Sequence, residues 1–113
     1  MNNFFYDIKQ ALLKELSDRL VSVPYIIKVR DTDTGAVINI THVEACFMQT
    51  VLYDILDADN VLRNGVRQPD GVVPPDALDR LLVEWIDDYN IEDEQHAVSV
   101  MFTCDDPTVE VVL

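Results

Sequence analysis

Two histidines and two cysteines are the residues of this chain whose types suit a transition metal. His42 and Cys46 are four residues apart, a spacing that places both side chains on one face of a helix. His96 and Cys104 would have to complete the site, but the strand expected between them covers about 26 Å, so one straight strand cannot supply both ligands. At most three ligands could then converge, whereas structural zinc takes four. We therefore expect no metal, and packing or surface roles for these side chains.

The polar segment 31–35 matches parts of two functional motifs. Its last three residues, Asp-Thr-Gly, form the triplet of aspartic proteases, but that triplet should follow an apolar strand, whereas a charged and polar run precedes it here. The spacing of Asp31, Asp33 and Gly35 resembles the start of an EF-hand loop, which needs glycine at position 6 and glutamate at position 12. Counted from Asp31, those positions hold Ala36 and His42. A turn between two strands explains the whole segment, and we expect neither chemistry.

The rest of the sequence contains no signature of catalysis. Cys46 and Cys104 lie in apolar neighbourhoods, which are typical of inert packing thiols. The three glycines are isolated, so no glycine-rich phosphate loop is present. We find no secretory signal and no apolar run of about 20 residues that could span a bilayer. We therefore predict a cytoplasmic protein that is not an enzyme, uses no cofactor and does not bind membranes.

Charge is the strongest functional signal of this 113-residue chain, whose formal net charge is −13. The first 30 residues carry five basic and three acidic side chains, whereas the remainder carries 18 acidic side chains and three arginines. Such a field repels nucleic acid and anionic membranes and attracts basic protein surfaces. The hydrophobic content of 49% argues against disorder and predicts a single folded domain over residues 1–113.

Hydrophobic spacing predicts the elements that position these charges. The expected helices span residues 2–22, 41–58 and 75–89, and the expected strands span 25–30, 36–41, 96–104 and 108–113. Thr41 is the expected N-cap of the second helix, with Glu44 completing a capping box. Residues 59–74 are expected to form an irregular loop. The predicted fold is therefore an α+β sandwich of order α-β-β-α-α-β-β, with a four-stranded antiparallel sheet packed against three helices.

Acidic residues of the third expected helix and of the segment after it form the candidate site. They are Asp76, Asp79, Glu84, Asp87, Asp88, Glu92, Asp93 and Glu94. Asp87 and Asp88 come near the end of the helix, where the helix dipole disfavours negative charge, so their placement costs stability and favours a binding role. Carboxylates on a helix and an adjoining turn can imitate DNA, whose duplex carries one charge per roughly 1.7 Å of its axis.

We therefore expect a small acidic inhibitor that occludes the basic surface of a nucleic-acid-handling protein by phosphate mimicry. In size and acidity the chain resembles phage- and plasmid-encoded antirestriction proteins, anti-CRISPR proteins and uracil-glycosylase inhibitors. This resemblance of type implies a basic protein partner and no direct contact with nucleic acid.

Three other interpretations stay open. A toxin-neutralising immunity protein would use the same electrostatic attraction to a basic partner. The acidic face could also serve only to keep the protein in solution. Finally, the chain could be a structural or assembly subunit, such as a virion component, in which the final strand 109–113 pairs with a second copy to give a homodimer or larger homo-oligomer.

Overall fold

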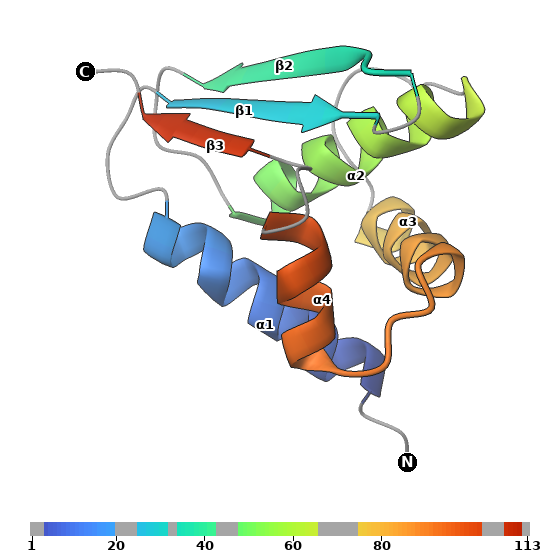
Figure 1. The fold of residues 1–113 in the computed structure, drawn as a ribbon. Coiled ribbons are helices and arrows are strands. Elements are labelled where there is room, and N and C mark those ends of the chain that lie inside the picture. Colours follow the sequence, from blue (N-terminus) through green and yellow to red (C-terminus); the bar gives the residue numbers. More distant parts are fainter. Residues whose placement is uncertain are drawn as a thin grey trace.

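Four helices and three strands form the part of the chain that the computed structural model describes, residues 4–19, 25–31, 34–42, 48–65, 75–102 and 108–111. In chain order they are α1 (Phe4–Arg19), β1 (Tyr25–Arg30), β2 (Val37–His42), α2 (Met48–Asn64), α3 (Pro75–Asp88), α4 (Glu94–Phe102) and β3 (Thr108–Val111). Figure 1 shows the strands gathered in one sheet, with the helices on one side of it. The described elements therefore make two layers, an arrangement that belongs to the α+β class.

The sheet contains the first expected hairpin, which is confirmed. β1 lies in the centre of the order β2-β1-β3, and both neighbours run antiparallel to it. The register pairs Ile27 with Ile40 and Val29 with Ile38, which places these four apolar residues on one face. Ile27 and Val29 are buried, and Ile38 and Ile40 pack against the core. The alternation of the two strands thus gives a sheet that is covered on one face.

The turn between β1 and β2 accounts for the Asp-Thr-Gly triplet. The carbonyl oxygen of Asp31 accepts a hydrogen bond from the Gly35 N–H at 2.7 Å, and the Asp31 N–H donates to the Ala36 carbonyl at 2.9 Å. Gly35 has a φ of 79°, a left-handed conformation that glycine adopts without steric cost. The glycine of the triplet therefore serves the turn.

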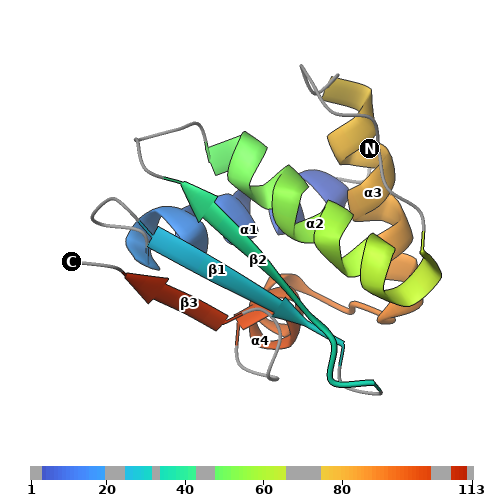
Figure 2. The same cartoon turned by 90° about the horizontal axis from the view of Figure 1, so that it is seen from above.

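Helix α2 is the central helix of the described elements. It contacts α1, α3 and the strands β1 and β2, and Figure 2 shows α2 and α3 side by side when the molecule is seen from above the sheet. Its buried side chains are those of Val51, Leu52, Tyr53, Ile55, Leu56 and Ala58. α1 contributes Ile8, Leu12 and Leu16 to the same core, and α4 packs against α1. One hydrophobic core therefore joins both layers.

The expected second hairpin is wrong, because residues 94–102 form helix α4 instead of a strand. Asp93 precedes this helix, and its Oδ1 accepts a hydrogen bond from the His96 N–H at 2.8 Å, as an N-cap does. Ala97 and Met101 are four residues apart and both buried, as helical spacing requires. β3 lies inside the expected strand 108–113 but pairs with β1. The predicted four-stranded sheet on three helices is therefore corrected to three strands and four helices among the described residues.

The expected start of the second helix is also wrong. Thr41 and His42 belong to β2, where the register pairs them with residues of β1. Thr41 is therefore not an N-cap, and His42 lies in a strand where a helical residue was expected. Glu44 and Cys46 themselves lie outside the described residues.

Helix α2 ends later than expected. It continues through Asn64, so the first six residues of the expected irregular loop are helical, while residues 66–74 of that loop lie outside the described residues. Gly65 follows the helix with a φ of 73°, and its N–H donates to the Val61 carbonyl at 2.8 Å. This glycine closes the helix in the way that left-handed C-terminal caps do. The extension brings Asp59 and Arg63 onto the helix.

Candidate protein-binding surface

Helix α3 divides into a buried apolar face and an exposed polar face. Its buried residues are Ala77, Leu78, Leu81, Leu82 and Trp85, and its exposed residues are Asp76, Arg80, Val83, Glu84, Asp87 and Asp88. Burying the first set at the helical period leaves the second set in solvent. Arg80 approaches Asp76 to 3.8 Å one turn along, and both side chains are highly exposed. Of the predicted site, Glu84, Asp87 and Asp88 therefore form the part of this face that no cation of α3 compensates.

Two of the predicted site residues pair with cations on other helices. Lys9 Nζ on α1 lies 3.0 Å from Asp79 Oδ1. On α2, an Arg63 guanidinium nitrogen lies 3.4 Å from Asp88 Oδ2. Asp79 and Asp88 thus tie α3 to α1 and α2, and part of their charge is already compensated inside the molecule. The structure therefore assigns these two carboxylates an intramolecular contact that the sequence did not indicate.

The chain leaves α3 through a tight turn of Schellman type. The Ile91 N–H donates to the Ile86 carbonyl at 3.0 Å, and the Asn90 N–H donates to the Asp87 carbonyl at 3.2 Å. Asn90 adopts a φ of 52°, which asparagine tolerates better than most residues. Ile91 is buried beneath the turn. These contacts fix the direction in which the following acidic residues are presented.

Two complementary hydrogen bonds join the first turn of α4 to the two residues that precede it. Asp93 Oδ1 accepts from the His96 N–H at 2.8 Å, and His96 Nδ1 accepts from the Glu92 N–H at 3.1 Å. Asp93 therefore has a structural role as a helix cap. The carboxylates of Glu92 and Glu94 take no part in either bond, and both residues are exposed.

Four members of the predicted site keep exposed carboxylates for which the described residues provide neither an ion pair nor a capping hydrogen bond. We call Glu84, Asp87, Glu92 and Glu94 the uncompensated carboxylates. They follow one another along the second half of α3, the turn after it and the first residue of α4. The described segment 75–102 carries eight carboxylates and one arginine in all. Within the described segment 75–102, the exposed negative charge that has no partner therefore lies at the α3–α4 corner.

Glu94 also lines a groove of about 440 Å³ between α1 and α4. The α1 side of this groove includes Asp7, Glu15, Asp18 and Lys14. Glu15 is paired with Arg19 at 2.8 Å, one turn along the same helix. Sequence reasoning missed these α1 carboxylates because the first 30 residues are net basic, and because residues 96–104 were expected to form a strand.

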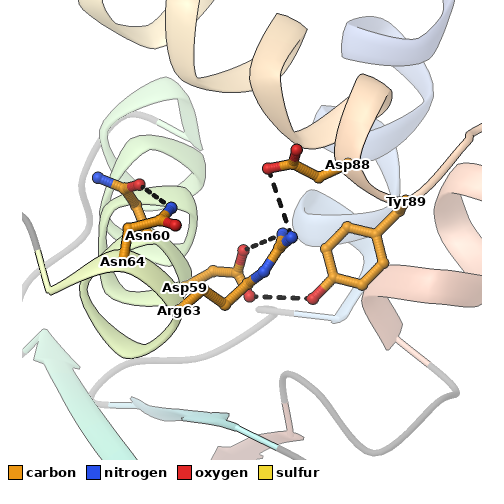
Figure 3. Close-up of polar contacts among 6 residues, drawn as sticks. All are labelled: Asp59, Asn60, Arg63, Asn64, Asp88 and Tyr89. Carbon is orange, nitrogen blue, oxygen red and sulfur yellow. Dashed lines mark hydrogen bonds and ion pairs between the residues drawn. The ribbon is translucent and has the colours of Figure 1, made fainter.

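A polar cluster joins the C-terminal halves of α2 and α3 (Figure 3). Tyr89 donates its hydroxyl hydrogen to Asp59 Oδ1 at 3.2 Å, and Asp59 Oδ2 lies 3.5 Å from an Arg63 guanidinium nitrogen. The guanidinium of Arg63 also lies over the Tyr89 ring, 4.6 Å from its centroid. With Asp88 on its far side, Arg63 contacts two carboxylates and an aromatic ring. The cluster therefore joins α2 to the end of α3.

Burial and the neighbouring opposite charge have opposite effects on the pKa values of Asp59 and Arg63. Burial raises the pKa of the Asp59 carboxyl above its usual value; the Arg63 charge and the hydrogen bonds from Tyr89 and Arg63 oppose the rise, while the Asp88 carboxylate adds to it. Burial also lowers the pKa of Arg63, but Asp59, Tyr89 and Asp88 outweigh it and raise that pKa overall. The charge of Arg63 is therefore the largest of the effects that favour the ionised form of Asp59 against its burial.

The described residues contain no group of three or more histidine, cysteine, aspartate and glutamate side chains arranged to hold a metal ion. Cys104, one of the residues considered for such a site, lies outside the described part. None of the described helices combines the length and the apolar character needed to cross a bilayer. Comparisons with protein-family models, with curated proteins and with solved structures gave no match.

Proposed function

We propose that this chain is a small acidic cytoplasmic protein that binds the basic surface of a nucleic-acid-handling protein and occludes it. One observation supports the proposal above the others. After the intramolecular ion pairs of Asp76, Asp79 and Asp88 are formed, the uncompensated carboxylates remain exposed around the α3–α4 corner. Exposed like charges raise the free energy of the isolated protein, and a cationic partner relieves that cost.

Rigid presentation supports the same proposal. The Schellman turn at Asn90 and the Asp93 cap hold the backbone between α3 and α4, so the carboxylates of the corner project from a fixed scaffold. The buried face of α3 fixes the rotation of that helix and hence the direction of Glu84 and Asp87. A partner would therefore meet an ordered array of charge, which favours competition with nucleic acid phosphates for the same basic surface.

Neutralising Glu84 and Asp87 tests this surface. We expect the double variant Glu84→Gln, Asp87→Asn to bind a fluorescent ten-lysine peptide roughly fivefold to tenfold more weakly at low salt, since each exposed ion pair contributes about 0.2–1 kcal/mol. Binding is measured by fluorescence anisotropy. The affinity of the unchanged protein should fall steeply between about 20 mM and about 300 mM salt. In a mixture with a short DNA duplex, the protein should release the duplex from the peptide.

A second double variant separates a local site from net charge alone. Val37→Lys, Asn39→Lys alters two exposed positions of β2 and changes the net charge by the same amount as the first variant. We expect it to retain most of the peptide affinity. Equal losses in both variants would show that only the overall charge matters, and would contradict a binding surface at the corner.

A further inference from the structure

The hydrogen bond between the Glu92 N–H and His96 Nδ1 makes the protonation state of this histidine part of the α3–α4 turn. The two atoms are 3.1 Å apart, and the backbone N–H donates to the ring. Nδ1 can accept only while it carries no hydrogen, so the bond requires a neutral imidazole with its hydrogen on Nε2. A protonated ring would present an N–H to the Glu92 N–H, and two donors cannot bond to each other.

We propose that His96 is a proton-controlled switch of the acidic corner: the neutral ring holds the turn that presents Glu92 and Glu94, and protonation releases it and weakens binding of cationic partners. The weaker binding rests on the proposed function; the effect on the turn does not. Histidine side chains commonly change charge between about pH 5 and pH 8, and this general range sets the pH values of the tests below.

Protonation acts on the corner in three ways. The Glu92 N–H loses its acceptor. A positive charge appears in the first turn of α4, where the helix dipole favours negative charge. The three carboxylates of residues 92–94 then carry one compensating charge, which reduces the attraction for a cationic partner. The first two effects destabilise the turn between α3 and α4, and the third reduces the net negative charge there.

Other charged groups lie in the segments that precede α4 and on the helix that packs against it. They are Glu92, Asp93 and Glu94 in its own segment, Asp87 and Asp88 at the end of α3, and Asp7, Lys14, Glu15 and Asp18 on α1, the helix packed against α4. Most are carboxylates, which attract an imidazolium once the ring has turned away from Glu92.

Hydrogen exchange of the Glu92 amide, followed by NMR, tests the switch directly. Between about pH 7.5 and about pH 5.5 we expect its protection factor to fall roughly threefold to tenfold, the usual range for one net hydrogen bond. The Gly65 amide, which donates to the Val61 carbonyl, is an internal control that should keep its protection factor. His96→Asn is the matched variant, because asparagine Oδ1 stands where Nδ1 stood and accepts at every pH. Its Glu92 amide should stay protected at both pH values.

His96→Gln supplies the opposite reference, since glutamine places its polar atoms one bond further out and does not titrate. We expect its Glu92 amide to be poorly protected at both pH values, and the unchanged protein to approach it only at low pH. If His96→Asn fails to fold, the comparison of the unchanged protein with His96→Gln still tests the switch. Equal protection of the Glu92 amide in the unchanged protein at both pH values would overturn the switch.

Binding of the ten-lysine peptide at constant salt gives the functional outcome. We expect the affinity of the unchanged protein to fall about threefold more on acidification than that of His96→Asn. A pH-dependent Glu92 amide with equal losses of affinity would overturn the control of binding by His96. A pH-dependent amide with no peptide binding by any variant would reject the proposed function and leave His96 as a switch of the turn alone.

Discussion

Replacing Arg63 with methionine is expected to lower the free energy of unfolding by about 2 kcal/mol, because it leaves the Asp59 carboxylate without its cation. The Asp59 side chain is only 16% exposed, so water replaces the lost contact poorly. Methionine keeps much of the apolar bulk over the Tyr89 ring and removes the charge. Urea unfolding, followed through the fluorescence of Trp85, the single tryptophan of the chain, measures the loss.

Arg80 provides the matched control for this substitution. Its side chain is 70% exposed and lies 3.8 Å from Asp76, so Arg80→Met removes the same charge from a solvated ion pair. Such pairs contribute little, and we expect a change below about 0.5 kcal/mol. Similar losses for both variants would contradict the special role given to the Asp59 cluster.

The loss caused by Arg63→Met should also depend on pH. Burial raises the pKa of Asp59 in the folded protein, and removing Arg63 raises it further. A group whose folded pKa is raised contributes stability below its unfolded pKa, and this contribution is lost as the pH rises through the folded value. The difference from the unchanged protein should therefore be smaller near about pH 4 than near about pH 7. An equal difference at both pH values would mean that Asp59 does not carry the effect.

The error at residues 94–102 shows how a short apolar run misleads. Val98, Val100 and Phe102 alternate, and β-branched residues favour strands, so the sequence indicated a hairpin. The helical signals were also present, because Asp93 is a good N-cap and Ala97 and Met101 are four residues apart. Packing against α1 decides between the two patterns, and that contact lies about 80 residues away in sequence.

The start of α2 was predicted wrongly because a helix-capping pattern and strand pairing compete for the same residues. Thr41 and Glu44 have the types and spacing of a capping box, yet Thr41 pairs with Ile26 across the sheet. A cap contributes about 1 kcal/mol, and extending the hairpin adds ladder hydrogen bonds and side-chain pairs that outweigh it. Strands with clear alternation, such as β1 and the first part of β2, were placed correctly because Ile27 and Val29 are buried and Ile38 and Ile40 pack against the core on the same face.

The candidate site was predictable in composition but not in its internal pairing. The eight acidic residues could be read directly from the sequence, and so could the exposure of Glu84 and Asp87 from the helical period of α3. The contact of Asp79 with Lys9 joins residues 70 positions apart, and only the tertiary fold brings them together. Local patterns therefore identified the charged helix, and tertiary contacts decided which of its charges remain exposed.

Truncating Leu12 to alanine is expected to have the largest effect of the changes considered, a loss of about 3 kcal/mol in the free energy of unfolding. Leu12 is fully buried in α1, the helix that packs against both α2 and α4. Alanine leaves a cavity that the surrounding helices fill only in part. Leu13→Ala is the matched control, because it makes the same chemical change at the next position, which is only partly buried. We expect that variant to lose about 1 kcal/mol.

The comparison of the two leucines tests the acidic groove as well as the core. With Ile8, Leu12 and Leu16 buried, Asp7, Glu15 and Asp18 lie along the groove beside α4. A helix rotated by one residue would bury Leu13 in place of Leu12 and carry those carboxylates out of the groove. Equal losses for the two variants would indicate such a rotation. A much larger loss for Leu12→Ala would fix the orientation of α1, and with it the position of the groove carboxylates on its surface.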